Sequence, residues 1–405
     1  MGDNSVLQSL SHFDSEERAV LRALALGNNG TREQLIASSP WGRSKTDSIA
    51  KRLTDRGVLV VEEIKNETKG RSRYEYSIAE ELGYVIGVEL NPSGDRVSVS
   101  DLNGHIVAQR EMANSIDLSD VAESLDRNLS TLLEELGISP SRVGALCIGV
   151  HGLTNEREGI VRRFLYHDEE VSVSFTDYFR ANRGWQANIG RPKHLICLKE
   201  HANSYIADEK TFINVNIGFG VGLSIFVRGA YYPGFSGYSG EFGHVIIPGR
   251  DVPCYCGNRG CLRTLASYKG MCNEALRRLE EFQREGVFTP LQKELLQTSN
   301  YEVGAEHLIE QASKQEKLSV HLMQDIATHV GETLATVVSV LNPEILIIHS
   351  NLLHAGDSFT APLDAAIQRN ALSLALRGLK IEYLEWRRFA VSEGATVLAL
   401  QRLFV

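Results

Sequence analysis

Residues 240–264 read GEFGHVIIPGRDVPCYCGNRGCLRT, and the candidate metal ligands in this stretch decide how the rest of the chain is interpreted. The ligands are one histidine and three cysteines, namely His244, Cys254, Cys256 and Cys261. One imidazole and three sulfurs complete a tetrahedral zinc site and leave no coordination position open for water. The stretch therefore predicts a structural zinc that pins a loop with little core of its own. The alternative is a set of free buried thiols beside an unrelated histidine.

Cysteine usage and composition restrict the class of protein. The chain has 405 residues and only six cysteines, too few for a disulfide framework at this length. No stretch approaches the roughly 18 apolar residues of a membrane span, and the polar start MGDNSVLQSL is unlike a signal peptide. We expect a cytoplasmic protein of two or three domains that makes no contact with a membrane.

The first 80 residues show the pattern of a small DNA-binding domain. Apolar periodicity, capping residues and turn signals predict three helices, over residues 14–26, 31–39 and 43–57, and two strands, over 58–64 and 73–78. Three short helices followed by a hairpin are typical of a winged helix-turn-helix. The sequence therefore predicts such a domain over residues 1–80.

Charge is distributed as a DNA-reading domain requires. Residues 1–80 have no net charge and the remainder holds the whole −9, yet residues 41–73 contain nine Lys and Arg against five Asp and Glu. A basic surface on an acidic body favours binding of double-stranded DNA through one face only. The third helix is expected to present its first residues to the major groove, namely Arg43, Ser44, Lys45, Asp47 and Ser48. The hairpin is expected to place three cations near phosphates or in the minor groove, namely Lys69, Arg71 and Arg73. The alternative is a packing or dimerisation module with a solvated basic face.

The rest of the chain alternates strands and helices. A β-meander begins after Leu82, and two similar cycles of strands and helices follow. This order predicts a two-lobed α/β body with a cleft between the lobes. We expect one lobe over residues 82–198, completed by the C-terminal helix at about 390–405, and a second lobe over 199–389 that carries the zinc loop.

The order Gly-Glu-x-Gly-His followed by Cys-x-Cys-Gly-x-x-Gly-Cys-Leu resembles the signature of the ROK family of repressors, open reading frames and sugar kinases. The added N-terminal domain is similar to that of the repressor branch. The resemblance implies an actin-like ATPase fold, structural zinc and a sugar pocket beside the zinc loop. It also implies homodimers or homotetramers on palindromic operators.

The elements needed for phosphoryl transfer are incomplete. Kinases of the family begin their body with Asp-x-Gly-Gly-Thr, whereas Glu89–Ser93 reads Glu-Leu-Asn-Pro-Ser, and the proline removes an amide donor. The family's catalytic Asn-Asp-Ala-Asn is matched to Glu-His-Ala-Asn at residues 200–203. A glycine-rich turn survives at 218–222, but such a turn is weak evidence by itself. Residues 349–351 lack the family's late pair of glycines. The sequence therefore predicts that the protein is not an enzyme.

The resemblance also carries over candidate ligand-binding residues. Three match the family pattern, namely Asn203, Glu241 and His244, and three depart from it, namely Glu200, His201 and Arg263. His244 is expected to bind zinc through one ring nitrogen and to face the ligand with the other. Losing a carboxylate and gaining a guanidinium favours a modified or acidic sugar. The alternative is that Arg263 folds back onto Glu200 or Glu241 and closes the cleft.

We therefore predict a sequence-specific transcription regulator, a repressor of carbohydrate metabolism genes, controlled by a sugar or sugar derivative. Two alternatives stay open. One is an atypical sugar kinase with a fused DNA-binding domain. The other is a regulator controlled by a protein partner that docks on the acidic body.

Overall fold

The computed structural model describes residues 12–26, 30–64, 73–115, 120–156, 158–165, 170–201, 205, 208–235, 237–286, 289, 291–297 and 300–404. The chain forms two compact units, residues 1–203 with 388–405 and residues 204–387. The lobe boundaries expected from the sequence stay a prediction. The N-terminal module belongs to the first unit, and its status as a separate domain over residues 1–80 stays a prediction.

Within its described residues, the N-terminal module contains three helices and a two-stranded hairpin, as the sequence predicts. Its elements are α2 (Ser15–Ala25), α3 (Arg32–Ser38), α4 (Arg43–Asp55), β1 (Leu59–Ile64) and β2 (Arg73–Ile78). Asp14 caps α2 in a capping box with Glu17, and the side chain of Thr31 caps α3. The strands β1 and β2 are antiparallel. Local capping and pairing signals therefore fix this module.

The body of the first unit is built on a five-stranded sheet. Its strands are β3 (Tyr84–Leu90), β4 (Asp95–Asp101), β5 (Ile106–Met112), β6 (Val143–Val150) and β10 (Gln186–Gly190), in the order β10-β6-β3-β4-β5. The meander β3-β4-β5 is antiparallel, whereas β10, β6 and β3 run parallel. A small antiparallel sheet that the sequence did not predict contains β7 (Gly152–Asn155), β8 (Ile160–Phe164) and β9 (Val173–Ser174).

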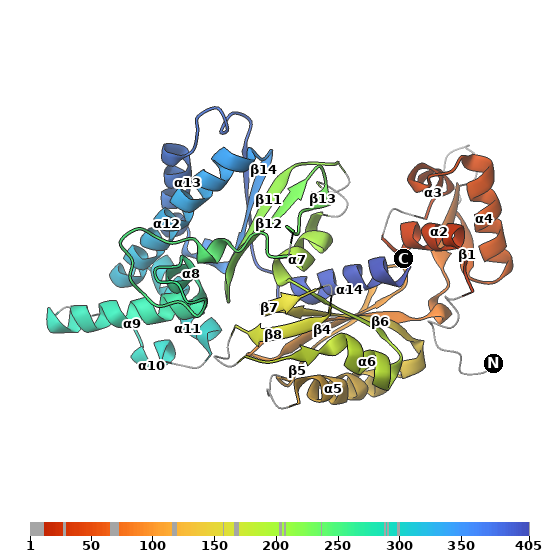
Figure 1. Ribbon diagram of the computed structural model, residues 1–405, viewed down its shortest axis with the longest axis horizontal. Coiled ribbons are helices and arrows are strands. Elements are labelled where there is room, and N and C mark those ends of the chain that lie inside the picture. The colour runs from red at the N-terminus through yellow and green to blue at the C-terminus, as the bar shows by residue number, and fades with distance from the viewer. Residues whose placement is uncertain are drawn as a thin grey trace. The chain divides into compact units, whose positions relative to one another are not determined.

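Helices cover both faces of this sheet. They are α5 (Val121–Glu135), α6 (Phe175–Arg183), α7 (Pro192–His201) and α14 (Ala390–Leu403). Figure 1 shows α5 and α6 on one face and α7 and α14 on the other. A Cβ on Gly394 of α14 would meet the carbonyl oxygen of Leu195 on α7 at 1.9 Å, so only glycine permits this approach. The C-terminal helix is therefore an integral part of the first unit.

The N-terminal module is joined to this body at the turn between β4 and β5. The Asn103 side chain accepts from the backbone N–H of Ile78 at 2.6 Å and donates to its carbonyl at 2.8 Å. Arg142 donates to the carbonyl of Glu80 at 2.9 Å. These bonds satisfy the backbone at the end of β2, so the body holds the end of the hairpin.

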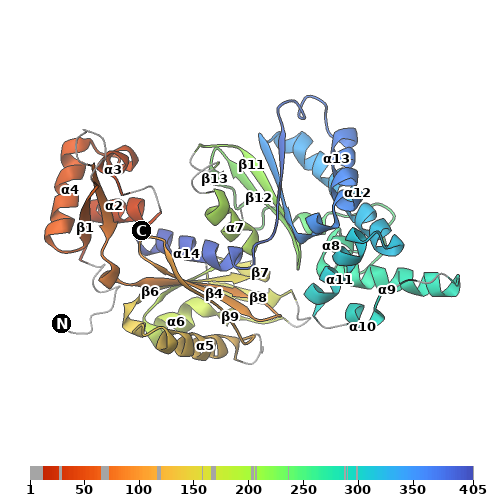
Figure 2. The ribbon, with the colours of Figure 1, turned by 180° about the vertical axis from the view of Figure 1, so that it is seen from behind.

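The second unit contains another five-stranded sheet, in the order β13-β12-β11-β14-β15. Its strands are β11 (Phe212–Ile217), β12 (Val221–Val227), β13 (Ala230–Tyr231), β14 (Ile345–Ser350) and β15 (Lys380–Leu384). Its helices are α8 (Arg263–Ala266), α9 (Tyr268–Arg284), α10 (Lys293–Leu296), α11 (Tyr301–Ser313), α12 (Lys317–Leu341) and α13 (Asp357–Asn370). The sequence predicted α12 and α13, which lie side by side (Figure 2), but missed α9 and α11. Within the described residues, no helix combines the length and apolarity needed to cross a bilayer.

Candidate functional site

The helix α4 presents its first two turns to solvent. Arg43, Ser44, Lys45 and Ser48 are exposed, whereas Ile49 and Leu53 on the opposite face are buried in the module's core. Gly42 precedes the helix without a side-chain cap. The free amides of an α-helix N-terminus and exposed donors beside them suit contacts with phosphates and base edges. The end of α4 expected to meet DNA is therefore the polar, accessible one.

Two of the predicted DNA-binding side chains have partners inside the module. Asp47 is half-buried and accepts from Arg32, with its Oδ1 2.8 Å from the Nε of Arg32. This hydrogen bond and the charge of Arg32 lower the pKa of Asp47. Lys45 pairs with Glu16 and lies 5.4 Å from the ring centroid of Trp41. Asp47 therefore orients α4 against α3.

The predicted wing is only partly described. Arg73 is the first residue of β2, whereas Lys69 and Arg71 lie outside the described residues. The backbone register pairs Arg73 with Ile64 at the tip of the hairpin. The contribution of these three cations to DNA binding stays a prediction.

The four candidate metal ligands converge in the metal loop, residues 240–264. Their ligand atoms lie within 4.8 Å of one another. The Nδ1 of His244 is 3.7 Å from the Sγ of Cys254, and the Sγ atoms of Cys256 and Cys261 are 3.6 Å apart. A tetrahedral zinc with Zn–S bonds of about 2.3 Å would separate two sulfurs by about 3.8 Å. The donor set and its spacing therefore fit a single tetrahedral metal ion.

Local backbone structure holds the ligands in place. Isolated bridges pair Ile246 with Cys261 and Pro253 with Arg259. A Cβ on Gly260, whose φ is +74°, would meet the carbonyl oxygen of Arg250 at 2.2 Å. Burial raises the pKa of the Cys261 thiol to about 12, so a metal ion is needed to stabilise its thiolate. Turns hold the ligand atoms of the loop together, and Phe242, Ile247 and Leu262 anchor it in the core of the second unit.

The Nε2 of His244 has a neighbour within the metal loop. It lies 3.2 Å from the hydroxyl of Tyr255, a side chain that the sequence-based reasoning did not single out. Arg263 stands over the Tyr255 ring, with its Cζ 4.2 Å from the centroid. The expectation that this nitrogen faces a ligand stays a prediction, and a ligand would meet Tyr255 beside it. The position of Tyr255 between two ligating cysteines was the available signal.

The remaining predicted ligand residues are divided between the units. Glu241 directly precedes the short 3₁₀ helix η4 (Phe242–His244) of the second unit. Glu200 is in the last turn of α7 in the first unit, which ends at His201. Only the backbone of His201 is described, and Asn203 lies outside the described residues. A shared ligand site for these residues stays a prediction.

Glu89 begins the segment that the sequence matches to the kinase phosphate turn, and other side chains of the protein engage its carboxylate. Glu89 is fully buried; its Oε1 lies 2.8 Å from the Nε2 of His151, and its Oε2 lies 3.4 Å from the Nη1 of Arg96. We call Glu89, Arg96 and His151 the Glu89 cluster. Arg96 also donates to Glu111, which pairs with Arg388. The sequence-based reasoning missed His151 and Arg96, although His151 directly follows a buried strand.

The turn itself is closed by internal hydrogen bonds. Asn91 accepts from the N–H of Ser93 at 2.9 Å, and Asp95 accepts from the N–H of Asn91 at 3.2 Å. Burial raises the pKa of Asp95 to about 6. The backbone N–H groups of Asn91 and Ser93 are therefore engaged by side chains of the same turn.

Residues 218–222 and 349–351 also have structural roles. Residues 218–220 form the hairpin turn between β11 and β12, in which the N–H of Gly218 donates to the carbonyl of Gly220. Ser350 donates to the carbonyl of Ile217 and accepts from the N–H of Leu352. His349 lies 2.8 Å from the carbonyl oxygen of Glu385 through its Nε2. Side-chain hydrogen bonds stabilise the segment that follows β14.

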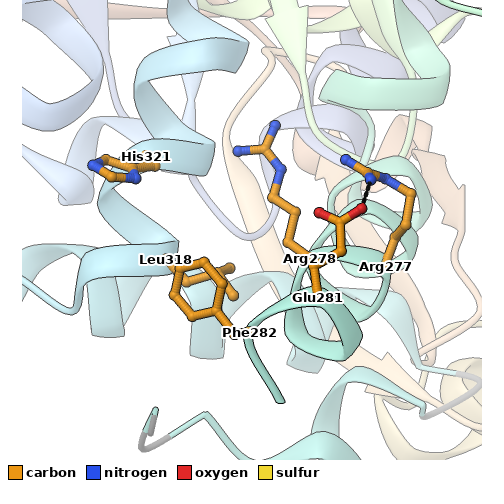
Figure 3. Close-up of a pocket in the computed structure, with 6 residues that line it drawn as sticks. All are labelled: Arg277, Arg278, Glu281, Phe282, Leu318 and His321. Carbon is orange, nitrogen blue, oxygen red and sulfur yellow. Dashed lines mark hydrogen bonds and ion pairs between the residues drawn. The ribbon is translucent and has the colours of Figure 1, made fainter. Parts of the chain in front are cut away.

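A pocket of about 270 Å³ lies between α9 and α12, as Figure 3 shows. It is lined by Arg277, Arg278, Glu281, Phe282, Leu318 and His321. Arg277 pairs with Glu281, and both arginines donate to the buried Glu274. Arg278 also pairs with Asp325 at 2.6 Å. Because the charges of both arginines are met by the protein, the pocket does not qualify as an anion site.

Comparison with known proteins identifies the family. Residues 85–402 match the ROK family, and the chain belongs to it. The chain is 22% identical over 413 residues to a putative xylose repressor of Caldicellulosiruptor sp. (strain Rt8B.4), with 99% of this chain and 98% of the relative covered. The predicted family is therefore confirmed.

Solved structures show the same fold. A ROK family transcriptional regulator, a homolog of the E. coli MLC protein, matches with a TM-score of 0.77 and 20% identity over 96% of this chain and 97% of that chain. A ROK family glucokinase from Streptomyces griseus matches with a TM-score of 0.62 and 18% identity, covering 79% of this chain and 100% of that chain. The two-lobed actin-like fold is confirmed, and the regulator matches a larger share of this chain than the kinase does.

Proposed function

We propose that this protein is a sequence-specific DNA-binding transcription regulator that represses carbohydrate metabolism genes and responds to a sugar or sugar derivative. The observation that carries the proposal is the polar N-terminal half of α4 on a helical module fused to a ROK body. An exposed helix that follows a short helix and a turn is the element that reads the major groove in helix-turn-helix proteins. Similarity to a putative xylose repressor over nearly the whole of both chains supports the same role.

The operator is double-stranded DNA with palindromic half-sites. A homodimer places two copies of α4 on one face of the duplex when the half-sites are about 34 Å apart. A homotetramer would bind two such sites. The exposed residues of α4 read bases, whereas the wing cations contact phosphates and supply affinity on any sequence.

The body has no catalytic role in this proposal. Within the Glu89 cluster, both oxygens of the only carboxylate are engaged by side chains of the protein, so Glu89 is a poor partner for magnesium. The phosphate turn also contains Pro92, which has no amide to donate. These features favour a regulator over an atypical kinase with a fused DNA-binding domain.

The metal is a structural zinc in this proposal. His244, Cys254, Cys256 and Cys261 would hold it and leave no open position for substrate or water. Zinc would supply a cross-link to a loop that also carries Glu241 and Arg263. The metal thereby orders the residues proposed to contact the effector.

Control by the effector follows from differential affinity. A sugar that prefers one conformation of the body shifts DNA affinity by the same factor by which DNA shifts sugar affinity. The bonds from Asn103 to Ile78 supply a direct connection from the body to the hairpin. We infer that they transmit this preference to the DNA-binding module.

Selection of DNA from a random double-stranded pool by the full-length protein tests the proposal. We expect an enriched palindrome and no heat of ATP binding in calorimetry. Enrichment of no sequence would contradict DNA recognition. ATP binding with phosphorylation of a sugar would favour the kinase alternative.

A further inference from the structure

The metal loop carries an aromatic side chain between two of the candidate ligands. Tyr255 is half-buried, and its ring meets the His244 ring edge-on at a centroid distance of 5.3 Å and an angle of 87°. On the same side chain, the guanidinium of Arg263 lies 4.2 Å from the ring centroid. Tyr255 therefore contacts a metal ligand and the only cation among the predicted ligand residues of this loop.

The orientation of His244 decides what Tyr255 does to it. Its Nδ1 faces Cys254 at 3.7 Å, so Nδ1 is the nitrogen directed at the metal position. A neutral imidazole that binds a metal through one nitrogen carries its proton on the other. The Nε2–H of His244 then donates to the Tyr255 hydroxyl at 3.2 Å. A ligand hydroxyl would have to displace this bond to reach His244.

Tyr255 also serves as a platform for Arg263. A guanidinium stacked on an aromatic face keeps its planar fork of donors directed sideways. Arg263 and Glu241 belong to the same metal loop as Tyr255, residues 240–264.

We propose that Tyr255 is a specificity-determining positioning residue, which covers Nε2 of His244 and holds Arg263 so that the loop selects a sugar carrying an oxyanion over a neutral sugar. This inference rests on the proposed function, because it names the class of effector. The fork of Arg263 donates to two oxygens of a carboxylate or phosphate. Glu241 accepts from a sugar hydroxyl. An acidic sugar offers both groups at once.

Thermal-shift titration of the full-length, zinc-loaded protein tests this role. The probes are glucose, glucuronate, glucose 6-phosphate and inorganic phosphate, and the variants are Tyr255→Phe, Tyr255→Ala and Arg263→Gln. In the wild type we expect one acidic sugar to bind at least 10-fold more tightly than glucose. Glucuronate and glucose 6-phosphate separate a carboxylate site from a phosphate site. Tyr255→Phe keeps the platform for Arg263 but uncovers Nε2 of His244, so it should retain acidic-sugar binding and bind glucose more tightly than the wild type does.

Tyr255→Ala and Arg263→Gln should both lose the preference while zinc content stays at the wild-type level. A structural role alone would change the melting temperature without changing the ratio between acidic and neutral sugars. Equal binding of glucose and the acidic sugars, a wild type that responds to no sugar, or an alanine variant with unchanged selectivity would overturn the proposal. A response to inorganic phosphate as large as that to the sugars would indicate an adventitious ion only and would also overturn it. Selection of DNA by the same wild-type sample judges the proposed function separately.

Discussion

The Glu89 cluster and the metal loop both bring ionisable side chains together, but the partners that meet these side chains differ. In the Glu89 cluster, a fully buried carboxylate meets an imidazole and a guanidinium supplied by the same chain. In the metal loop, three thiols and an imidazole converge on a single point. Buried charge must be neutralised by a partner, and thiolates at this spacing need a metal ion for that purpose.

The difference bears on the choice between a regulator and a kinase. A ROK body that transfers phosphate needs an accessible carboxylate and free backbone donors at the first turn. Here Arg96 and His151 use that carboxylate internally. The metal loop, in contrast, keeps every ligand of its metal site. This contrast favours the regulator that we propose over a kinase.

The largest expected effect is loss of the metal. Changing Cys256 to Ser removes one of four ligands, and we expect zinc content to fall from about one per chain to well below one. The melting temperature of the second unit should fall by about 10 °C, because metal binding contributes directly to folding free energy. Elemental analysis and calorimetry measure both. A fully stable variant, or a metal-free and stable wild type, would contradict the assignment of the metal loop.

The next effect concerns the Glu89 cluster. Replacing Glu89 by Gln leaves Arg96 and His151 as buried donors without their carboxylate, and we expect a loss of about 3 kcal/mol in unfolding free energy. Glu158→Gln is the matched control, because its pairing with Arg162 at 3.8 Å is at the surface. That control should cost no more than about 0.5 kcal/mol. Equal effects in urea unfolding would show that the cluster is not the buried network described.

Two carboxyl groups, Glu274 of the second unit and Asp95 of the first, should contribute to stability with opposite dependence on pH. Burial disfavours ionisation of Glu274, but hydrogen bonds from Arg277 and Arg278 prevail and lower its pKa to about 2. Its contribution, at most about 3 kcal/mol, is present above the ordinary pKa of about 4.5 and is lost as pH falls toward 2. Asp95 has a raised pKa of about 6, so its contribution is present below about 3.8 and is lost as pH rises through 6.

Stability against pH in Glu274→Gln and Asp95→Asn measures these contributions. Glu274→Gln should flatten the loss of stability below pH 4.5, and Asp95→Asn should flatten the change between pH 4 and 6. If the curves of unfolding free energy against pH were parallel for the wild type and both variants, the sign of both pKa shifts would be refuted.

The wing gives the smallest effect, because its cations are expected to act through solvent-screened contacts. Arg71→Ala combined with Arg73→Ala should weaken binding to any DNA by about 10-fold and reduce the salt slope by about two. Arg110→Ala, an exposed arginine of β5, is the control and should change neither quantity. Ser44→Ala should alter base preference more than total affinity. An unchanged salt slope in the wing variant would show that residues outside the wing make the phosphate contacts.

Sequence patterns predicted what depends on local signals. Asp14 and Thr31 cap their helices, and Gly57 follows the end of α4 with a φ of +70°. The spacing of Cys254, Cys256 and Cys261 predicted a cluster that the structure brings together. Helices α9 and α11 were missed, although α9 has an amphipathic pattern over 17 residues. The residues that complete the sites were harder to find, because they depend on contacts between distant elements.

Three such residues illustrate the limit. His151 lies 62 positions from Glu89, and Asn103 lies 25 positions from Ile78. Neither partner can be read from spacing within a helix or strand. Tyr255 was close in sequence, but the rotamer that directs its hydroxyl at His244 is set by packing. Long-range pairing and side-chain orientation therefore required the structure.

The most direct test of the central claim is the affinity of the full-length protein for the palindrome enriched by selection, measured by fluorescence anisotropy with and without a stabilising sugar. We predict binding at least 1,000-fold tighter than to a scrambled duplex at physiological salt. The sugar should lower that affinity by about 5- to 150-fold, the usual range of allosteric coupling. Equal affinity for the palindrome and the scrambled duplex would contradict the claim that this ROK protein is a sequence-specific regulator.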